Sequence, residues 1–290
     1  AEVIFHIGMG KTGSSSLQRA LHMNRTALMR DQGLEYLGLW FDLIDRQFHG
    51  YEGQVSFYSQ SGDEMRDMAD RFYAALQPRM TDGVDRFLIS NEAIYGYPDN
   101  FSEFCNRLAE HCDVTLICYA RNPVDWLPSA YVQWGVFHKA HKGRSPTFAE
   151  YAQRQIKSYA ALVRWNNLAT GCRFVLRRFE KGTDVVEDFA ETCNLSFDVR
   201  PERALERITP AEVVFRSVFN SEVEGEMLPH KFSKMVPVSF ANNDLSIDRI
   251  IENSLEYSRA PQIVDENRSI VDTIRDGLGA SETQMEWVSA

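Results

Sequence analysis

Residues 8–16, with the sequence Gly-Met-Gly-Lys-Thr-Gly-Ser-Ser-Ser, combine glycines, a lysine and hydroxyl side chains. An apolar run, Val-Ile-Phe-His-Ile at residues 3–7, precedes them, and a helical spacing of apolar residues begins at Leu17. The stretch is therefore predicted to be a turn between a strand and a helix. Glycines let the backbone approach a ligand closely, and the first amides of a helix point outward at the positive end of its dipole. This pattern predicts a site for phosphate or a similar anion, to which Lys11 adds a mobile charge.

The order of the residues distinguishes this turn from the phosphate loop of nucleoside triphosphatases. That loop has a glycine, four other residues and then Gly-Lys-Ser/Thr. If the motif starts at Gly8, its second glycine is Gly13, but Ser14 stands where the lysine is required. If Lys11 is the motif's lysine, Phe5 takes the place of the first glycine. A small-molecule kinase that uses magnesium-ATP is thus disfavoured by the register and stays open as an alternative.

A second candidate site follows the clearest predicted strand. Residues 114–119, Val-Thr-Leu-Ile-Cys-Tyr, form the apolar run that is typical of a strand buried in a parallel sheet, and Arg121 comes directly after it. Ser129 lies eight residues further on, in a helix predicted to begin near Val124 and to be kinked near Pro128. A guanidinium group and a hydroxyl can together hold a phosphate that is separate from the one at the first turn.

Taken together, the two segments resemble sulfotransferases that use 3′-phosphoadenosine 5′-phosphosulfate (PAPS), in particular bacterial members. Residues 11–18, Lys-Thr-Gly-Ser-Ser-Ser-Leu-Gln, resemble the family's 5′-phosphosulfate loop, and Arg-Asn-Pro at 121–123 with Ser129 resembles its 3′-phosphate-binding segment. Residues 174–181 and the apolar helix after them also look like a late strand-and-helix unit of bacterial members. The resemblance covers about residues 3–195. It implies PAPS as co-substrate, no metal, and an α/β fold of the nucleotide-kinase type.

The resemblance also assigns roles by position. The residues that would hold the 5′-phosphosulfate are Lys11, Thr12, Gly13, Ser14, Ser15 and Ser16, and those that would hold the 3′-phosphate are Arg121 and Ser129. Lys11 would in addition be catalytic, because it would stabilise charge on the bridging oxygen as the sulfuryl group departs.

The acceptor hydroxyl also needs a general base. The family takes it from segments after the second or third strand, as histidine or glutamate. His49 and Glu92 are the two candidates here, and the choice between them stays open. The sequence lacks the Lys-Thr-His segment that cytosolic sulfotransferases carry after the third strand, so the identity of the base does not follow from the resemblance.

Strands and helices are predicted to alternate through most of the chain. Strands are expected at 3–7, 34–39, 86–90, 114–119 and 172–177, and helices at 14–31, 63–80, 101–111, from about 124, up to about 169, and at 184–193, 210–224 and 262–277. Residues 40–60 show no clean period and are expected to be a loop, which either lines a pocket or is an irregular surface connection. This order predicts an α/β fold, with a parallel sheet flanked by helices on both faces.

We expect a single sulfotransferase domain over residues 1–290, with a core over about 1–200 and a mainly helical extension or lid over about 201–290. Residues 8–16, Ser90-Asn91-Glu92 and Arg121 each follow a predicted strand. Ligands of open parallel sheets bind beyond the carboxyl ends of the strands. These three groups are therefore expected to converge at one edge of the sheet.

The composition limits the possible partners. The chain has 31 Lys and Arg against 41 Asp and Glu, a net charge of −10, which disfavours binding to nucleic acid. It favours a small molecule, a carbohydrate or a lipid head group as acceptor over a long polyanion. Its five cysteines form no Cys-x-x-Cys pair and are expected to be reduced thiols. No run reaches the roughly 20 apolar residues of a membrane span and no leader is recognised, so a cytoplasmic protein is expected.

Two things do not follow from the sequence. The oligomeric state is not predicted, and a non-catalytic nucleotide-binding protein with the same fold stays open beside the enzyme.

Overall fold

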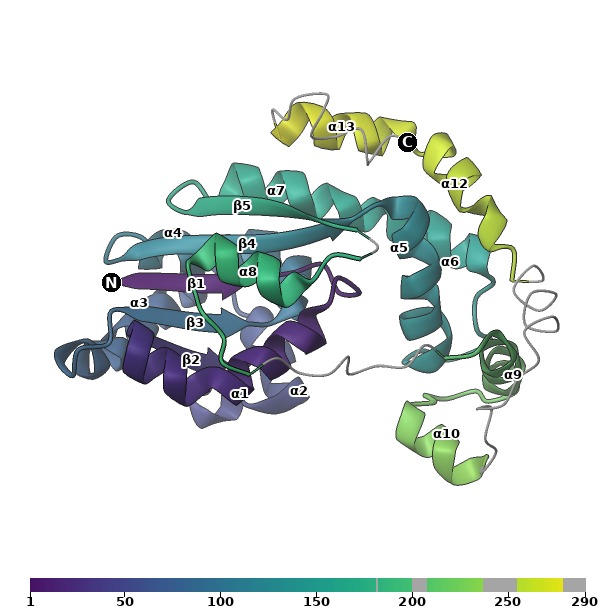
Figure 1. The fold of residues 1–290 in the computed structure, drawn as a ribbon. Helices are drawn as coiled ribbons and strands as arrows, with labels where there is room; N and C mark the ends of the chain where they lie inside the picture. Colours follow the sequence, from purple (N-terminus) through teal and green to yellow (C-terminus); the bar gives the residue numbers. More distant parts are fainter. Residues whose placement is uncertain (181, 200–207, 237–254, 279–290) are drawn as a thin grey trace. The chain divides into compact units, whose positions relative to one another are not determined.

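A computed structural model describes residues 1–180, 182–199, 208–236 and 255–278 (Figure 1). These residues form two compact units. The first unit holds residues 1–121, 160–180, 182–199 and 276–278, and the second holds residues 122–159, 208–236 and 255–275. None of the described helices is both long and apolar enough to cross a membrane.

The first unit is built on a parallel sheet whose strands, among the described residues, run in the order β2-β3-β1-β4-β5. They are β1 (Glu2–His6), β2 (Leu34–Gly38), β3 (Arg86–Ser90), β4 (Asp113–Arg121) and β5 (Arg173–Phe179). Central β1 pairs with both β3 and β4, so that Phe5 lies opposite Ile89 on one side and Leu116 on the other. All four strand pairs are parallel, which confirms the predicted α/β class with a parallel sheet.

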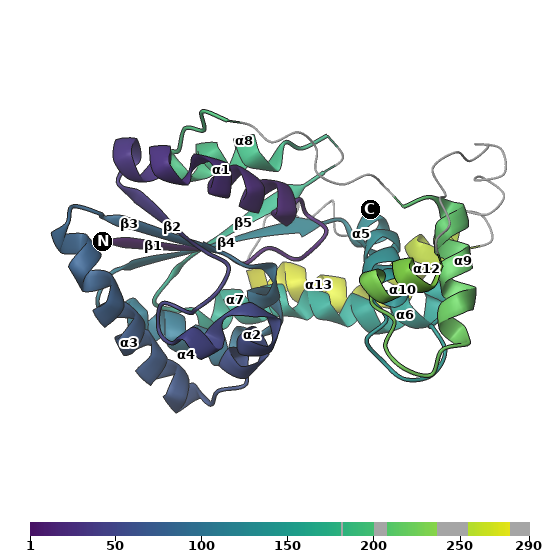
Figure 2. The same cartoon turned by 90° about the horizontal axis from the view of Figure 1, so that it is seen from below.

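Helices cover both faces of this sheet (Figure 2). One face carries α1 (Ser14–Gln32) and α8 (Val185–Cys193), and the other carries α3 (Gly62–Thr81), α4 (Pro98–Leu108) and α7 (Ala160–Leu168). Under α1, its leucines pack on Ile4, Leu88 and Ile117. The opposite face has a core of aromatic rings, from Phe5, Phe41, Phe72, Phe101 and Phe104. The predicted helices on both faces are thus confirmed.

Residues 40–60 differ from the expected loop. They contain a 3₁₀ turn (Arg46–Phe48) and the helix α2 (Gly50–Tyr58). The expectation was wrong because glycine disfavours a helix by its intrinsic propensity, whereas here tertiary packing requires it. Gly53 is instead the point where α2 packs directly on the backbone of residues 47 and 48, and a Cβ there would clash. Burial of Phe57, whose ring stacks on Phe41 at 4.2 Å between centroids, then stabilises a short helix of low intrinsic propensity.

The connections between the strands determine at which edge of the sheet a ligand site can form. The chain leaves β1 towards β2 on one side of the sheet, and leaves β4 towards β5 on the other side. Since β1 and β4 are neighbours, their outgoing connections diverge at the carboxyl ends of the two strands. Such a topological switch point is where open α/β sheets bind their ligands.

The second unit is helical in its described residues. It contains α5 (Pro123–Ala130), a π-helical segment (Tyr131–Phe137), α6 (Phe148–Gln155), a 3₁₀ turn (Ile156–Tyr159), α9 (Pro210–Ser221), α10 (Pro229–Met235), a 3₁₀ turn (Tyr257–Arg259), α12 (Ala260–Glu266) and most of α13 (Arg268–Leu278). The single helix expected near 262–277 is divided at Asn267. The parts of the expected C-terminal extension at 201–207, 237–254 and 279–290 lie outside the described residues.

Candidate functional site

The predicted anion loop lies at the switch point, along the end of β4. The amide of Ile7 donates to the Ile117 carbonyl at 2.9 Å, and the amide of Met9 donates to the Tyr119 carbonyl at 3.2 Å. At the end of β4, the Arg121 guanidinium donates to the Lys11 carbonyl at 3.4 Å. The expected convergence of the loop and Arg121 is therefore confirmed.

The loop backbone is held in left-handed conformations. Lys11 has φ 68° and Gly13 has φ 86°. A lysine in this region costs roughly 1–2 kcal/mol relative to ordinary helical geometry, and such strain is concentrated at functional sites. Left-handed residues in a turn bring successive amides onto one concave side, which is an arrangement that binds anions. The loop is thus shaped by the main chain as well as by its side chains.

The start of α1 is left available to a ligand. Gly13, its N-cap residue, provides no side-chain cap, and the Ser16 and Leu17 amides both donate to the Gly13 carbonyl. Ser15 is exposed and Ser16 is half-buried in this first turn. An uncapped helix N-terminus supplies amide donors and the positive end of the helix dipole to an anion.

Two hydroxyls in the loop are buried without a hydrogen-bond partner among the described residues. Thr12 is fully buried and Ser14 is 4% exposed, and among the described residues neither hydroxyl oxygen has a hydrogen-bond partner. A buried polar group without a partner costs about 1–3 kcal/mol. An oxyanion bound in the loop would supply the acceptor oxygens that these hydroxyls lack.

A buried histidine lies beneath the loop. His6 is the last residue of β1, and its Nδ1 is 2.8 Å from the Ser90 hydroxyl. Burial lowers the pKa of this ring from 6.5 to about 3, so the ring is neutral at ordinary pH. A Cβ on Gly8 would lie 2.8 Å from His6 Nε2 and 3.2 Å from the Ser14 hydroxyl, so only glycine allows the loop to approach this ring so closely.

Glu92 follows β3 and contacts the same helix that carries the loop. Its carboxylate accepts a hydrogen bond from Gln18 Nε2 at 2.8 Å, and the same nitrogen donates to the Ser90 carbonyl at 3.1 Å. The expected placement of residues 90–92 at the loop's edge of the sheet is confirmed. Glu92 therefore anchors the N-terminal part of α1.

Asn91 ties the segment that carries His49 to the same edge. Its backbone amide donates to the His6 carbonyl at 3.0 Å. Its side-chain amide donates to the Leu39 carbonyl at 2.9 Å and to Gln54 Oε1 at 2.7 Å. Because α2 begins at Gly50, directly after His49, and contains Gln54, these bonds fix the start of that helix near the end of β1.

His49 itself lies on the surface and is paired. Its Nδ1 is 2.7 Å from Asp42 Oδ2, and its side chain is 64% exposed. Ser129, the second residue predicted for the 3′-phosphate, is half-buried on α5 in the second unit, whereas Arg121 belongs to the first. The pairing of Arg121 with Ser129 therefore stays a prediction.

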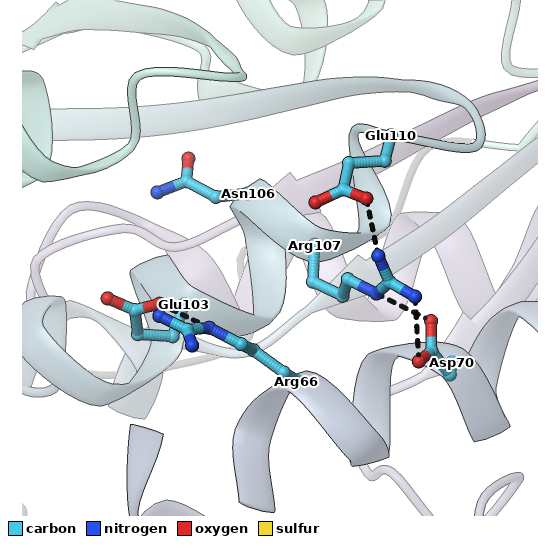
Figure 3. A pocket seen from close by; sticks show the side chains of 6 residues that line it. All are labelled: Arg66, Asp70, Glu103, Asn106, Arg107 and Glu110. Atoms are coloured by element: carbon cyan, nitrogen blue, oxygen red, sulfur yellow. Dashed lines mark hydrogen bonds and ion pairs between the residues drawn. The ribbon is translucent and has the colours of Figure 1, made fainter. Parts of the chain in front are cut away.

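A surface hollow on the first unit contains none of the predicted site residues. It has a volume of about 500 Å³ and is lined by Arg66 and Asp70 of α3, by Glu103, Asn106 and Arg107 of α4, and by Glu110 in the turn after α4 (Figure 3). Its charges pair with one another, as Arg66 does with Glu103 at 2.6 Å and Arg107 with Asp70 at 2.9 Å. This is an ion-pair network that joins two helices, and we assign it no ligand.

Sequence reasoning assigned no function to four side chains at the candidate site, which are His6, Gln18, Asp42 and Asn91. Gln18 closes the loop motif without an assigned role, Asp42 belongs to no motif, His6 is part of an apolar strand run, and Asn91 stands between Ser90 and the candidate base Glu92. The one available signal was the spacing of Asp42 and His49, a carboxylate and an imidazole in one short aromatic segment.

Comparisons with known proteins add no assignment. No protein-family model matches the chain, and no curated protein is significantly similar to it. Within the described parts of the chain, no group of three or more His, Cys, Asp or Glu side chains is arranged to hold a metal ion.

Proposed function

We propose that this protein is a sulfotransferase that moves a sulfuryl group from PAPS to a hydroxyl or amine of a small molecule, a carbohydrate or a lipid head group. The observation that carries the proposal is the burial of the Thr12 and Ser14 hydroxyls, which find no hydrogen-bond partner in the part of the chain that the structure describes. They lie in a strained glycine loop at the switch point, with the Arg121 guanidinium against it.

The residues of the loop fit the donor's 5′-phosphosulfate end. Hydroxyls and uncapped helix amides are donors, and the phosphosulfate offers acceptor oxygens. Glycine at position 8 lets the loop pack closely on His6, and the left-handed backbone at Lys11 and Gly13 gives the turn a shape that can bind an anion. Arg121, at the end of β4, supplies a permanent positive charge for a second anionic group.

The proposed mechanism gives each group one task. When bound, PAPS supplies an activated sulfuryl group whose departure leaves negative charge on the bridging phosphate oxygen. Lys11 stabilises that charge, and the loop hydroxyls and amides hold the donor in position. A base at the carboxyl edge of the sheet removes the proton of the acceptor.

The register of the loop separates this proposal from a kinase. Lys11 precedes the last glycine of the loop, whereas the ATP-binding loop requires lysine directly after it. A non-catalytic nucleotide-binding protein predicts the same donor binding, without transfer of the sulfuryl group.

Substitution of the two hydroxyls tests the proposal. In Thr12→Val with Ser14→Ala, two unsatisfied buried groups are removed, so the free energy of unfolding of the free protein should be unchanged or higher by about 1 kcal/mol. Binding of 3′-phosphoadenosine 5′-phosphate (PAP), the donor's product, should weaken by about 10-fold or more, because each hydroxyl donates to a charged oxygen. Calorimetric titration of PAP and urea unfolding measure the two quantities, and Thr26→Ala, at an exposed position further along α1, is the control.

The outcomes are distinct. Equal PAP affinity in the wild type and the double variant would exclude the loop as the donor site. Binding of magnesium-ATP by the wild type without binding of PAP would establish the kinase alternative.

A further inference from the structure

The pair formed by His49 and Asp42 has the geometry of a positioned base. Asp42 Oδ2 lies 2.7 Å from Nδ1 of His49. The Trp40 ring packs against the imidazole at 5.9 Å between centroids. The Asp42 carboxylate and the Trp40 ring, both from the segment just before His49, therefore contact the imidazole on two sides.

The hydrogen bond determines which nitrogen carries the proton. An ionised carboxylate can only accept hydrogen bonds, so Nδ1 of the neutral ring must be the protonated nitrogen. The other nitrogen, Nε2, then carries a lone pair and is able to take a proton. With 64% of the His49 side chain exposed, an acceptor molecule can reach the ring.

The segment is held at the edge where the anion loop lies. Asn91 holds the segment at three points, because it bonds to the Leu39 carbonyl ahead of Trp40, to Gln54 in α2 and to the His6 carbonyl at the end of β1. Gln54 is five residues beyond His49, or about 7 Å along the helix axis. The segment with His49 and Asp42 is thus held near the carboxyl end of β1 by the buried Asn91.

Glu92, the other candidate base, has a different task. Its carboxylate is bonded to Gln18 of α1, and Gln18 also bonds to the Ser90 carbonyl. These contacts stabilise the N-terminal part of the helix that carries the loop serines. The division of contacts favours His49 for proton transfer and Glu92 for positioning of α1.

We propose that Asp42 is a positioning residue, which fixes the tautomer in which Nε2 of His49, one of the two candidate bases, can accept the proton. This proposal rests on the proposed sulfotransferase function. As the acceptor oxygen bonds to sulfur, its proton passes to Nε2, the bond from sulfur to the bridging phosphate oxygen breaks, and that oxygen leaves with the electron pair as part of PAP. No other reactant is required.

The first measurement is the tautomer, which needs neither donor nor acceptor. Proton–nitrogen correlation spectra of ¹⁵N-histidine-labelled protein should show His49 protonated at Nδ1 in the wild type. In Asp42→Asn the amide can donate as well as accept, so the Nε2-protonated form should appear. Asp45→Asn is the matched control, because Asp45 lies in the same segment as Asp42 but has other contacts. It caps the 3₁₀ turn, and its carboxylate lies 3.6 Å from Arg71 of α3. It should leave the His49 signals unchanged.

The second measurement is release of PAP from PAPS, with water, p-nitrophenol or methyl glucoside as acceptor. Asp42→Asn should lower kcat on the order of 10- to 100-fold, with the KM for PAPS and PAP binding within about twofold of the wild type. His49→Ala should lose at least as much, and the double variant should lose no more than His49→Ala, because Asp42 acts only through His49.

A wild-type ring protonated at Nε2, unchanged kcat in Asp42→Asn, or losses that multiply in the double variant would each overturn the proposal. So would PAP release that does not depend on His49. A wild-type protein that fails to bind PAP would instead refute the sulfotransferase function, whatever the tautomer of His49.

Discussion

Acidification should destabilise this protein through His6. Burial lowers the pKa of the folded-state ring from 6.5 to about 3. Between these values the unfolded chain binds a proton that the folded protein does not, so the stability is complete above pH 6.5 and is lost as the pH falls towards 3. Each pH unit below 6.5 costs about 1.36 kcal/mol, so lowering the pH from about 7.5 to about 5 removes about 2 kcal/mol.

Urea unfolding of the wild type and of His6→Asn at the two pH values isolates this contribution. Asparagine does not titrate and keeps a polar group that can face Ser90, the partner of His6 Nδ1. Other groups that titrate contribute equally to both proteins, so the wild type should lose about 2 kcal/mol more than the variant. An equal loss in the two proteins would refute the reasoning, as would a His6 ring signal that titrates near pH 6.5 in NMR spectra.

Three further variants test the loop and its surroundings. Gly13→Ala should lower the free energy of unfolding by at least about 2 kcal/mol, because φ is 86° and the new Cβ would lie 2.7 Å from Val185 Cγ1; a change in urea midpoint that is negligible would contradict the described loop. Lys11→Ala should reduce release of PAP from PAPS by about 100-fold or more while the thermal unfolding midpoint is kept, and near-normal turnover would remove Lys11 from the mechanism. Arg121→Ala should weaken calorimetric PAP binding by roughly 10- to 100-fold, whereas unchanged affinity would show that Arg121 contacts no phosphate.

The sequence alone determined those features that depend on local periodicity and turn chemistry. The apolar run at 114–119 became the buried strand β4, and the leucines from Leu17 to Leu28 became the inner side of α1. Gly13 and Gly33 delimit that helix, and Gly33 takes the left-handed conformation at which helices commonly end. The convergence of the loop, Glu92 and Arg121 also followed, because parallel strands share one carboxyl edge.

Only the tertiary structure decided the features that depend on contacts between distant segments. The helix at residues 50–58 exists because Gly53 and Phe57 meet partners elsewhere in the fold, a fact that local propensity does not contain. Asn91 gains its role from Leu39, which is 52 residues away in the sequence. A hydrogen bond joins His49 to Asp42, and burial separates the hydroxyls of Thr12 and Ser14 from water. Hydrogen bonds and desolvation depend on the packed neighbours of a side chain, and those neighbours are set by the whole fold.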